Sequence, residues 1–295
     1  MFIQDTVNSL IDKKQALTTR KLLNVSHLSS EEIRTIAITL SYDSAITELR
    51  RQAGKKFIFH VASPKSGSTW IAQSVGPYLR TQGWKTPSMT VGGGNRAQDF
   101  FLSELIRLEA LDHDIFTDHQ HCVFSSYVLD LLIAINAKVV FQTRNLYDML
   151  ISLRDHLDNE TTVKPMFFID KNQWFALNQS EKLDFLIYNV APWYINLWVG
   201  WSQAQKVMGD NFLVIKYENL LENPDMVFEK LLDFSELPRK AFPASTDSIY
   251  TKQVFTRKNK AIIGRGELFT TEHRCHIERL CTPYKDIDFT VLGLS

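Results

Sequence analysis

The stretch that decides the fold of this chain is residues 57–70, which read Phe-Ile-Phe-His-Val-Ala-Ser-Pro-Lys-Ser-Gly-Ser-Thr-Trp. The apolar run at 57–62 is typical of a buried strand, and a helical pattern begins near Trp70. Between them lies a short loop of small residues that carries one lysine. Backbone N–H groups and the dipole at a helix start favour an anion. The stretch therefore predicts a phosphate-bearing ligand at residues 64–69.

This loop differs from the Walker A motif of ATP-binding proteins. That motif reads G-x-x-x-x-G-K-[ST], with its lysine directly before the helix. Here Lys65 comes before Gly67, the one glycine of the loop. The loop is therefore expected to bind phosphate, but not the phosphates of ATP presented with magnesium.

Outward from this loop, strand and helix patterns alternate along the chain. Strands are predicted at 57–62, 113–117, 138–142 and 212–216, and helices at 69–80, 98–110, 124–135, 146–157, 181–208 and 224–234. Residues 158–180 are predicted to be an irregular insertion. Such alternation predicts an α/β fold with a central parallel sheet flanked by helices. Ligands collect at the carboxyl ends of parallel strands, so the loops at 63–69, 118–122, 143–145 and 217–219 should share one rim.

The first part of the chain is expected to be a separate helical unit. Ser29 and Glu32 have the spacing of a capping box ahead of an apolar helical pattern. We therefore predict an N-terminal helical extension at 1–54 and a main domain at 55–295. The extension either packs on the main domain or serves as an arm that binds a partner.

Composition excludes several classes of function. The 33 basic and 33 acidic residues balance, which argues against wholesale nucleic-acid binding. No apolar run is long enough for a membrane span, and the N-terminus lacks the pattern of a secretory signal. The three cysteines are too scattered for a disulfide framework or a zinc site. These features lead us to expect a cytoplasmic protein.

Two further segments carry basic groups suited to phosphate. Arg144 follows the predicted strand at 138–142, and Ser152 lies about two turns into the next helix, so both could approach one anion. The alternative is an arginine on a surface loop and a serine in helix packing. Later, the cluster at 257–260 precedes Gly264 and Gly266 and could close over a phosphate. A solvated surface loop is the alternative for that cluster.

Together, these segments resemble the sulfotransferases that use 3′-phosphoadenosine 5′-phosphosulfate (PAPS). Residues 64–70 match the family pattern P-K-[ST]-G-[ST]-[ST]-W at every position, and Arg144 with Ser152 match its R-x7-S element. The late R-K-G-x-x-G loop is altered here, because Asn259 replaces its first glycine. Residues 216–224 and 193–201 are similar to the family's Y-E-[DN]-L turn and its tryptophan-bearing helix. The resemblance implies the P-loop NTPase-like sulfotransferase fold.

The resemblance also implies roles for individual residues. It assigns catalysis to Lys65, which would stabilise the leaving oxygen, and to His119 as general base, with His121 or a carboxylate as alternatives. Thr117 stands where the family has a lysine two residues before that histidine. The residues implied to bind the cofactor are Lys65, Ser66, Gly67, Ser68, Thr69, Trp70, Arg144, Ser152, Tyr217, Arg257, Lys258 and Asn259. No metal is implied.

The function expected from these residues is transfer of the sulfuryl group of PAPS to a hydroxyl, or less readily an amine, of a small-molecule acceptor. The product would be 3′-phosphoadenosine 5′-phosphate (PAP). Two alternatives remain open from the sequence. One is a P-loop kinase-like phosphotransferase, and the other is a catalytically inactive nucleotide-binding protein that acts through interactions. The acceptor and the oligomeric state are not specified by the sequence.

Overall fold

The computed structural model of this chain describes residues 54–87, 113–160, 166–237 and 264–294. Its centre is a parallel sheet of four strands in the order β2-β1-β3-β4. The strands are β1 (Phe57–Ala62), β2 (Ile115–Phe116), β3 (Lys138–Thr143) and β4 (Phe212–Lys216). The predicted α/β class with a central parallel sheet is confirmed. All four strands form where the sequence predicts them, although β2 is shorter.

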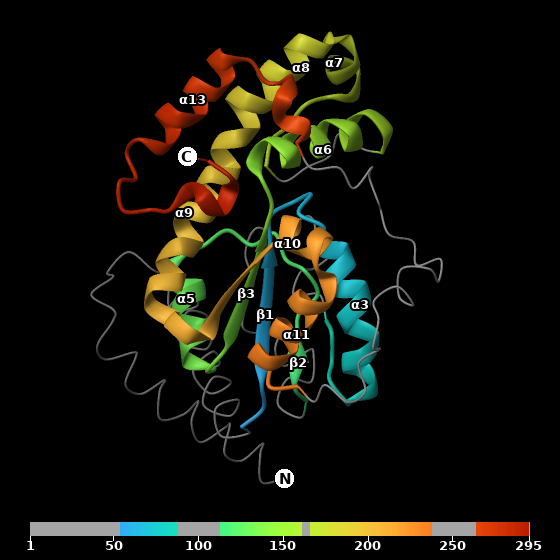
Figure 1. Ribbon diagram of the computed structural model, residues 1–295, viewed down its shortest axis with the longest axis vertical. Coiled ribbons are helices and arrows are strands. Elements are labelled where there is room, and N and C mark those ends of the chain that lie inside the picture. The colour runs from blue at the N-terminus through green and yellow to red at the C-terminus, as the bar shows by residue number, and fades with distance from the viewer. Residues whose placement is uncertain (1–53, 88–112, 161–165, 238–263, 295) are drawn as a thin grey trace, which may run out of the picture.

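Helices cover both faces of this sheet (Figure 1). On one face lie α3 (Ser68–Thr81) and α11 (Pro224–Phe234), and on the other lie α5 (Ser126–Ala134) and α9 (Ala191–Met208). Within β1, side chains alternate between the two cores: Phe59 packs on the α9 side and Ile58 on the α3 side. This period of two explains why β1 reads as a continuous apolar run, since both of its faces are buried.

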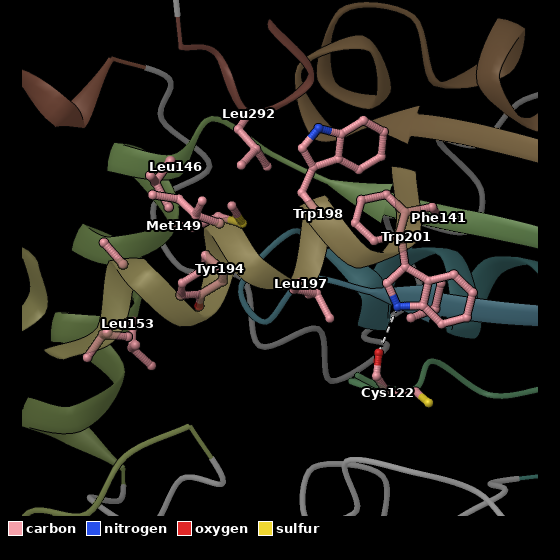
Figure 2. Packing of buried hydrophobic residues seen from close by; sticks show 14 of the residues in the cluster. Cys122, Phe141, Leu146, Met149, Leu153, Tyr194, Leu197, Trp198, Trp201 and Leu292 are labelled. Atoms are coloured by element: carbon pink, nitrogen blue, oxygen red, sulfur yellow. Dashed lines mark hydrogen bonds between the residues drawn. The ribbon is translucent and has the colours of Figure 1, made fainter. Parts of the chain in front are cut away.

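Helix α9 supplies three of the largest fully buried side chains, those of Tyr194, Trp198 and Trp201 (Figure 2). The indole of Trp198 lies 5.2 Å from the ring of Phe141 in β3, measured between ring centroids. One turn away, the indole N–H of Trp201 donates a hydrogen bond of 2.9 Å to the carbonyl oxygen of Cys122. These contacts fix α9 against the sheet, and with it Tyr194, which reaches the phosphate loop described below.

Above the carboxyl ends of the strands lies a group of further helices (Figure 1). The helices there are α6 (Leu146–Asn159), α7 (Lys171–Ala176), α8 (Gln179–Phe185), the π-helical turn η1 (Leu186–Val190) and α13 (Thr271–Cys281). The remaining elements are α10 (Tyr217–Glu222) and the 3-10 turns η2 (Gly209–Asn211), η4 (Arg265–Leu268) and η5 (Phe289–Leu292). The structure thus places a helical cap over the rim where ligands are expected.

The structure differs from the sequence expectation at four places. The single helix predicted at 181–208 is divided into α8, η1 and α9, because Pro192 at the start of α9 has no N–H to continue the α-helical ladder. The insertion predicted to be irregular contains α7. Helix α10 occupies the predicted loop at 217–219, and α13 was not predicted. The extension at 1–54 and the helix at 98–110 lie almost entirely outside the described residues.

Candidate active site

The loop between β1 and α3 has the backbone shape of an anion site. Lys65 has a φ of 67° and Gly67 a φ of 81°, so two residues with left-handed backbones stand on either side of Ser66. Such alternation turns neighbouring N–H groups toward a common hollow, as in other phosphate-binding loops. Gly67 is also the N-cap of α3 and has no side chain to satisfy the first amides of the helix. These two features are the ones expected of a loop that binds a phosphate through its backbone N–H groups.

Gly67 could not be replaced without moving a neighbouring ring. A Cβ atom at this position would lie 2.6 Å from the ring of Tyr217. The guanidinium of Arg144 lies over the same ring, 4.4 Å from its centroid. Three residues predicted from three separate loops are thus brought together in one stack at the carboxyl edge of the sheet.

Trp70 and Tyr217 contribute to the core beneath this loop. Each is only 8 % exposed, and both belong to the cluster on the α3 face of the sheet. Burial, partly offset by Arg144, raises the pKa of Tyr217, so its hydroxyl stays protonated.

The loop side chains divide into two groups. Ser66 is fully buried, and its hydroxyl donates a hydrogen bond of 2.6 Å to the carbonyl oxygen of Ser63. Ser68 is also buried at the first position of α3. Thr69, in contrast, is partly exposed and lines a cavity of about 390 Å³ beside the loop. Among the loop hydroxyl groups, that of Thr69 has the most direct access to this cavity.

His119 lies on the rim of the same cavity, next to Asp118. One carboxylate oxygen of Asp118 accepts hydrogen bonds from both the backbone N–H and the ring Nδ1 of His119, each 2.7 Å long. Burial raises the pKa of Asp118, but the hydrogen bonds and charge of His119 outweigh it and lower that pKa below its usual value. An ionised Asp118 fixes the proton of His119 on Nδ1 and leaves Nε2 as the basic nitrogen.

His121 has a different position. Its Nδ1 donates a hydrogen bond of 2.7 Å to the carbonyl oxygen of Ala62 at the end of β1. Its ring meets the edge of the His119 ring at 5.6 Å between centroids. His121 therefore ties the segment after β2 to the strand that leads into the phosphate loop, and His119 is the histidine that reaches the cavity.

Arg144 lies two residues before the first residue of α6 and Ser152 lies in the middle of that helix, and both are buried. Ser152 lies six positions after Leu146, about 9 Å along the helix axis. An anion shared by the two side chains would have to lie between them. The guanidinium of Arg144 also reaches Asp148 at 3.5 Å, so its charge is partly balanced within the protein.

Asp148 attaches the late glycine segment to this part of the rim. Its two carboxylate oxygens accept hydrogen bonds from the N–H groups of Gly264, at 3.0 Å, and Gly266, at 3.1 Å. A Cβ atom on Gly266 would lie 2.5 Å from that of Tyr147, so the segment lies directly against α6. Arg257, Lys258 and Asn259 lie outside the described residues.

Two residues that sequence reasoning missed hold the loop in place. The hydroxyl of Tyr194 in α9 donates a hydrogen bond of 3.0 Å to the carbonyl oxygen of Pro64. The side-chain amide of Gln142 in β3 donates one of 2.8 Å to the carbonyl oxygen of Ser66. A glutamine directly after the apolar run at 139–141 is the one signal in the sequence that could have pointed to the second contact.

Within the described ranges, no three His, Cys, Asp or Glu side chains gather closely enough to hold a metal ion. Over the same ranges, none of the helices combines the length and the apolar character needed to cross a membrane.

Comparison with known proteins gives one family match. The model of the sulfotransferase domain family matches residues 55–263. Among solved structures, the mouse sulfotransferase SULT7A1 complexed with PAP is similar at 14 % sequence identity and a TM-score of 0.52, over 84 % of this chain and 92 % of that chain. Sulfotransferase STF9 from Mycobacterium avium matches at 11 % identity and a TM-score of 0.37, over 96 % of this chain and 64 % of that chain. A search of curated proteins found no match. The likeness to the mouse protein is one of fold.

Proposed function

Because this chain belongs to the sulfotransferase domain family, we propose that it transfers the sulfuryl group of PAPS to an acceptor hydroxyl and releases PAP. The acceptor is a small molecule, and an amine is the less favoured acceptor group. The observation that carries this proposal is the phosphate loop, in which Lys65 and Gly67 have left-handed backbones at the start of α3. The cytoplasmic location expected from the sequence belongs to the same proposal.

The residues of the loop fit the phosphosulfate end of PAPS. The loop offers backbone N–H donors and the positive charge of Lys65, and both suit the negatively charged phosphosulfate group. The close approach of Tyr217 to Gly67 leaves no room for a side chain at that position. The guanidinium of Arg144 lies over the same tyrosine ring. This position supports a role for Arg144 in binding the 3′-phosphate, together with Ser152.

The residues of the rim divide the chemical work. PAPS supplies a sulfuryl group whose bond to the bridging oxygen breaks as the bond to the acceptor oxygen forms. His119 Nε2 accepts the proton that the acceptor hydroxyl loses, while Asp118 accepts the hydrogen bond from Nδ1 and stabilises the positive imidazole. Lys65 stabilises the negative charge that develops on the departing phosphate oxygen. This scheme requires no metal ion.

Labelled PAPS provides the direct test. The purified protein should be incubated with PAPS carrying a labelled sulfuryl group and with hydroxyl and amine acceptors from a fractionated extract of the source organism. We expect one labelled product for each PAP released, with no loss of rate in EDTA. Transfer of phosphate from ATP that depends on magnesium would instead support the kinase-like alternative. Binding of PAP without transfer to any acceptor would support an inactive nucleotide-binding protein.

A further inference from the structure

Two carbonyl oxygens of the phosphate loop, two residues apart, accept hydrogen bonds from side chains of two other elements. Tyr194 belongs to α9 and holds the carbonyl of Pro64, and Gln142 belongs to β3 and holds the carbonyl of Ser66. Tyr194 packs in the core on the α9 side of the sheet, whereas Gln142 follows Val140 at the spacing of two that places it on the α3 side. Both donors are fully buried. The loop therefore receives one contact from each side of the sheet.

His60 fixes the orientation of Gln142. The Nε2 of His60 lies 3.1 Å from the side-chain oxygen of Gln142, and the amide nitrogen of the same side chain is the donor to Ser66. Both ends of the amide are thus engaged, which requires His60 to carry its proton on Nε2. Burial and the nearby His119 lower the pKa of His60 to about 4, against smaller opposing effects of Gln142 and Asp118, so the ring is neutral at neutral pH.

These two contacts determine where the loop N–H groups point. In a trans peptide the C=O and the following N–H point in opposite directions, and all described peptide bonds are trans. Holding the carbonyl of Pro64 inward turns the N–H of Lys65 outward, and holding the carbonyl of Ser66 does the same for Gly67. Lys65 and Gly67 are also the two residues of the loop with positive φ, so the tethered peptides are those that lead into its left-handed positions.

We infer that Tyr194, Gln142 and His60 are positioning residues that aim the Lys65 and Gly67 amides at the 5′-phosphate end of the nucleotide. This inference rests on the proposed function, since it assumes that the loop receives that end of PAPS or PAP. None of the three side chains needs to touch the nucleotide. Their effect is specific to one end of the ligand, which separates it from a general contribution to stability.

The test compares two nucleotides that differ only at the 5′ end. PAP carries both phosphates, whereas adenosine 3′-phosphate lacks the one that would lie in the loop. Tyr194→Phe removes one hydroxyl, and the double variant His60→Leu with Gln142→Leu replaces the buried polar pair by an apolar pair that can still pack. For each, titration calorimetry should show a Kd for PAP raised about three- to tenfold, as expected for one lost hydrogen bond. The Kd for adenosine 3′-phosphate should change by less than about twofold.

Two controls accompany these variants. Tyr284→Phe also removes a tyrosine hydroxyl that contacts α9, through Asn196 at 3.1 Å, but away from the loop, and should leave both Kd values unchanged. His60→Gln keeps a side-chain N–H near the position of Nε2 and should retain most of the PAP affinity. Far-ultraviolet circular dichroism confirms that each variant is folded before titration.

Three results would overturn the inference. The first is an unchanged Kd for PAP in both Tyr194→Phe and the double variant. The second is an equal loss of affinity for the two nucleotides, which would indicate a merely structural role. The third is a loss for Tyr284→Phe as large as that for Tyr194→Phe. If the wild-type protein binds neither nucleotide, the proposed function itself fails, and this outcome is distinct from the other three.

Discussion

A substitution of Lys65 should affect the rate of sulfuryl transfer much more than the affinity for the nucleotide. Its charge lies in the loop proposed to hold the departing phosphate, where negative charge grows only as the sulfuryl group leaves. Lys65→Met should therefore lower kcat by about 10²- to 10³-fold while the Kd for PAP rises much less. Steady-state sulfate transfer and calorimetry measure the two effects. Lys206→Met, at the exposed end of α9, is the matched control, and a Lys65 variant with near wild-type kcat would contradict the assigned role.

Asp118 should act on catalysis through His119. Asp118→Asn keeps the size of the side chain but lets an amide N–H face Nδ1, which favours the wrong tautomer of the histidine. We expect kcat to fall about 10- to 10³-fold with little change in the Kd for PAP. Because the pKa of Asp118 is lowered by His119, the carboxylate stays ionised from neutral pH down to below its usual range. The kcat values of the variant and the wild type should be measured from pH 5 to pH 9. Near neutral pH, their ratio should be constant. An unchanged kcat would exclude this pair as the general base.

At the level of single residues, short motifs predicted the loop and the rim histidine, but not their supports. Lys65 and Gly67 could be proposed as site residues from their neighbours in the sequence, and their roles stay predictions. Tyr194 and Gln142 could not, because each contacts the loop across a separation of 130 and 76 residues. Such contacts depend on how α9 and β3 pack, which local patterns do not encode.

At the level of elements, Asp148 connects α6 to the backbone of the segment that forms η4. Its side chain is buried and accepts two backbone N–H groups from the segment that begins at Gly264. Asp148→Ala leaves those two donors and Arg144 without the carboxylate, which should lower the free energy of unfolding by about 2–4 kcal/mol. Urea unfolding measures the change.

Asp155 provides the comparison on the same helix. It pairs with Arg265 of η4 through side chains alone, in a partly exposed position. Asp155→Ala should therefore cost less than about 1 kcal/mol. An equal decrease in the free energy of unfolding for the two variants would show that the backbone contacts of Asp148 stabilise the fold no more than the side-chain pair of Asp155.

The secondary structure could be predicted well where its signal is local. Buried apolar runs predicted all four strands, and the apolar periodicity after Arg144 predicted α6. The break between α8 and α9 was missed because Pro192 is compatible with the first turn of a new helix as well as with a kink. Helix α13 was missed because its sequence is largely polar and only His273 and Ile277 are buried, so apolar periodicity gives little signal there.

At the scale of the whole molecule, one parallel sheet brings the described parts of the candidate site to a single edge. The order β2-β1-β3-β4 places β1 between β2 and β3, so the phosphate loop lies between the segment of His119 and the segment of Arg144. The sequence predicted the shared rim from the alternation of strands and helices. It could not predict the order of the strands, which depends on long-range pairing. The division into units at 1–54 and 55–295 stays a prediction.

The buried His60 should make the stability of the whole protein depend on mildly acidic pH. Its folded pKa of about 4 lies below the ordinary 6.5, so the unfolded state binds the proton first as the pH falls. Stability is therefore complete above pH 6.5 and is lost between pH 6.5 and 4. The loss is about 2 kcal/mol between pH 7 and pH 5. Urea unfolding at both pH values measures it. The His60→Gln variant should lose less over this interval, and an identical loss would assign the effect to other groups.

Because Lys65 has a left-handed backbone, thermal stability and activity favour different residues at position 65. A non-glycine residue with φ near 67° carries a backbone cost of about 1 kcal/mol that glycine escapes and asparagine reduces. A library screened for heat resistance alone should therefore enrich glycine or asparagine at position 65. The survivors would keep the fold and lose the reaction. Directed evolution of a hardier enzyme from this chain thus needs a selection for sulfate transfer in every round.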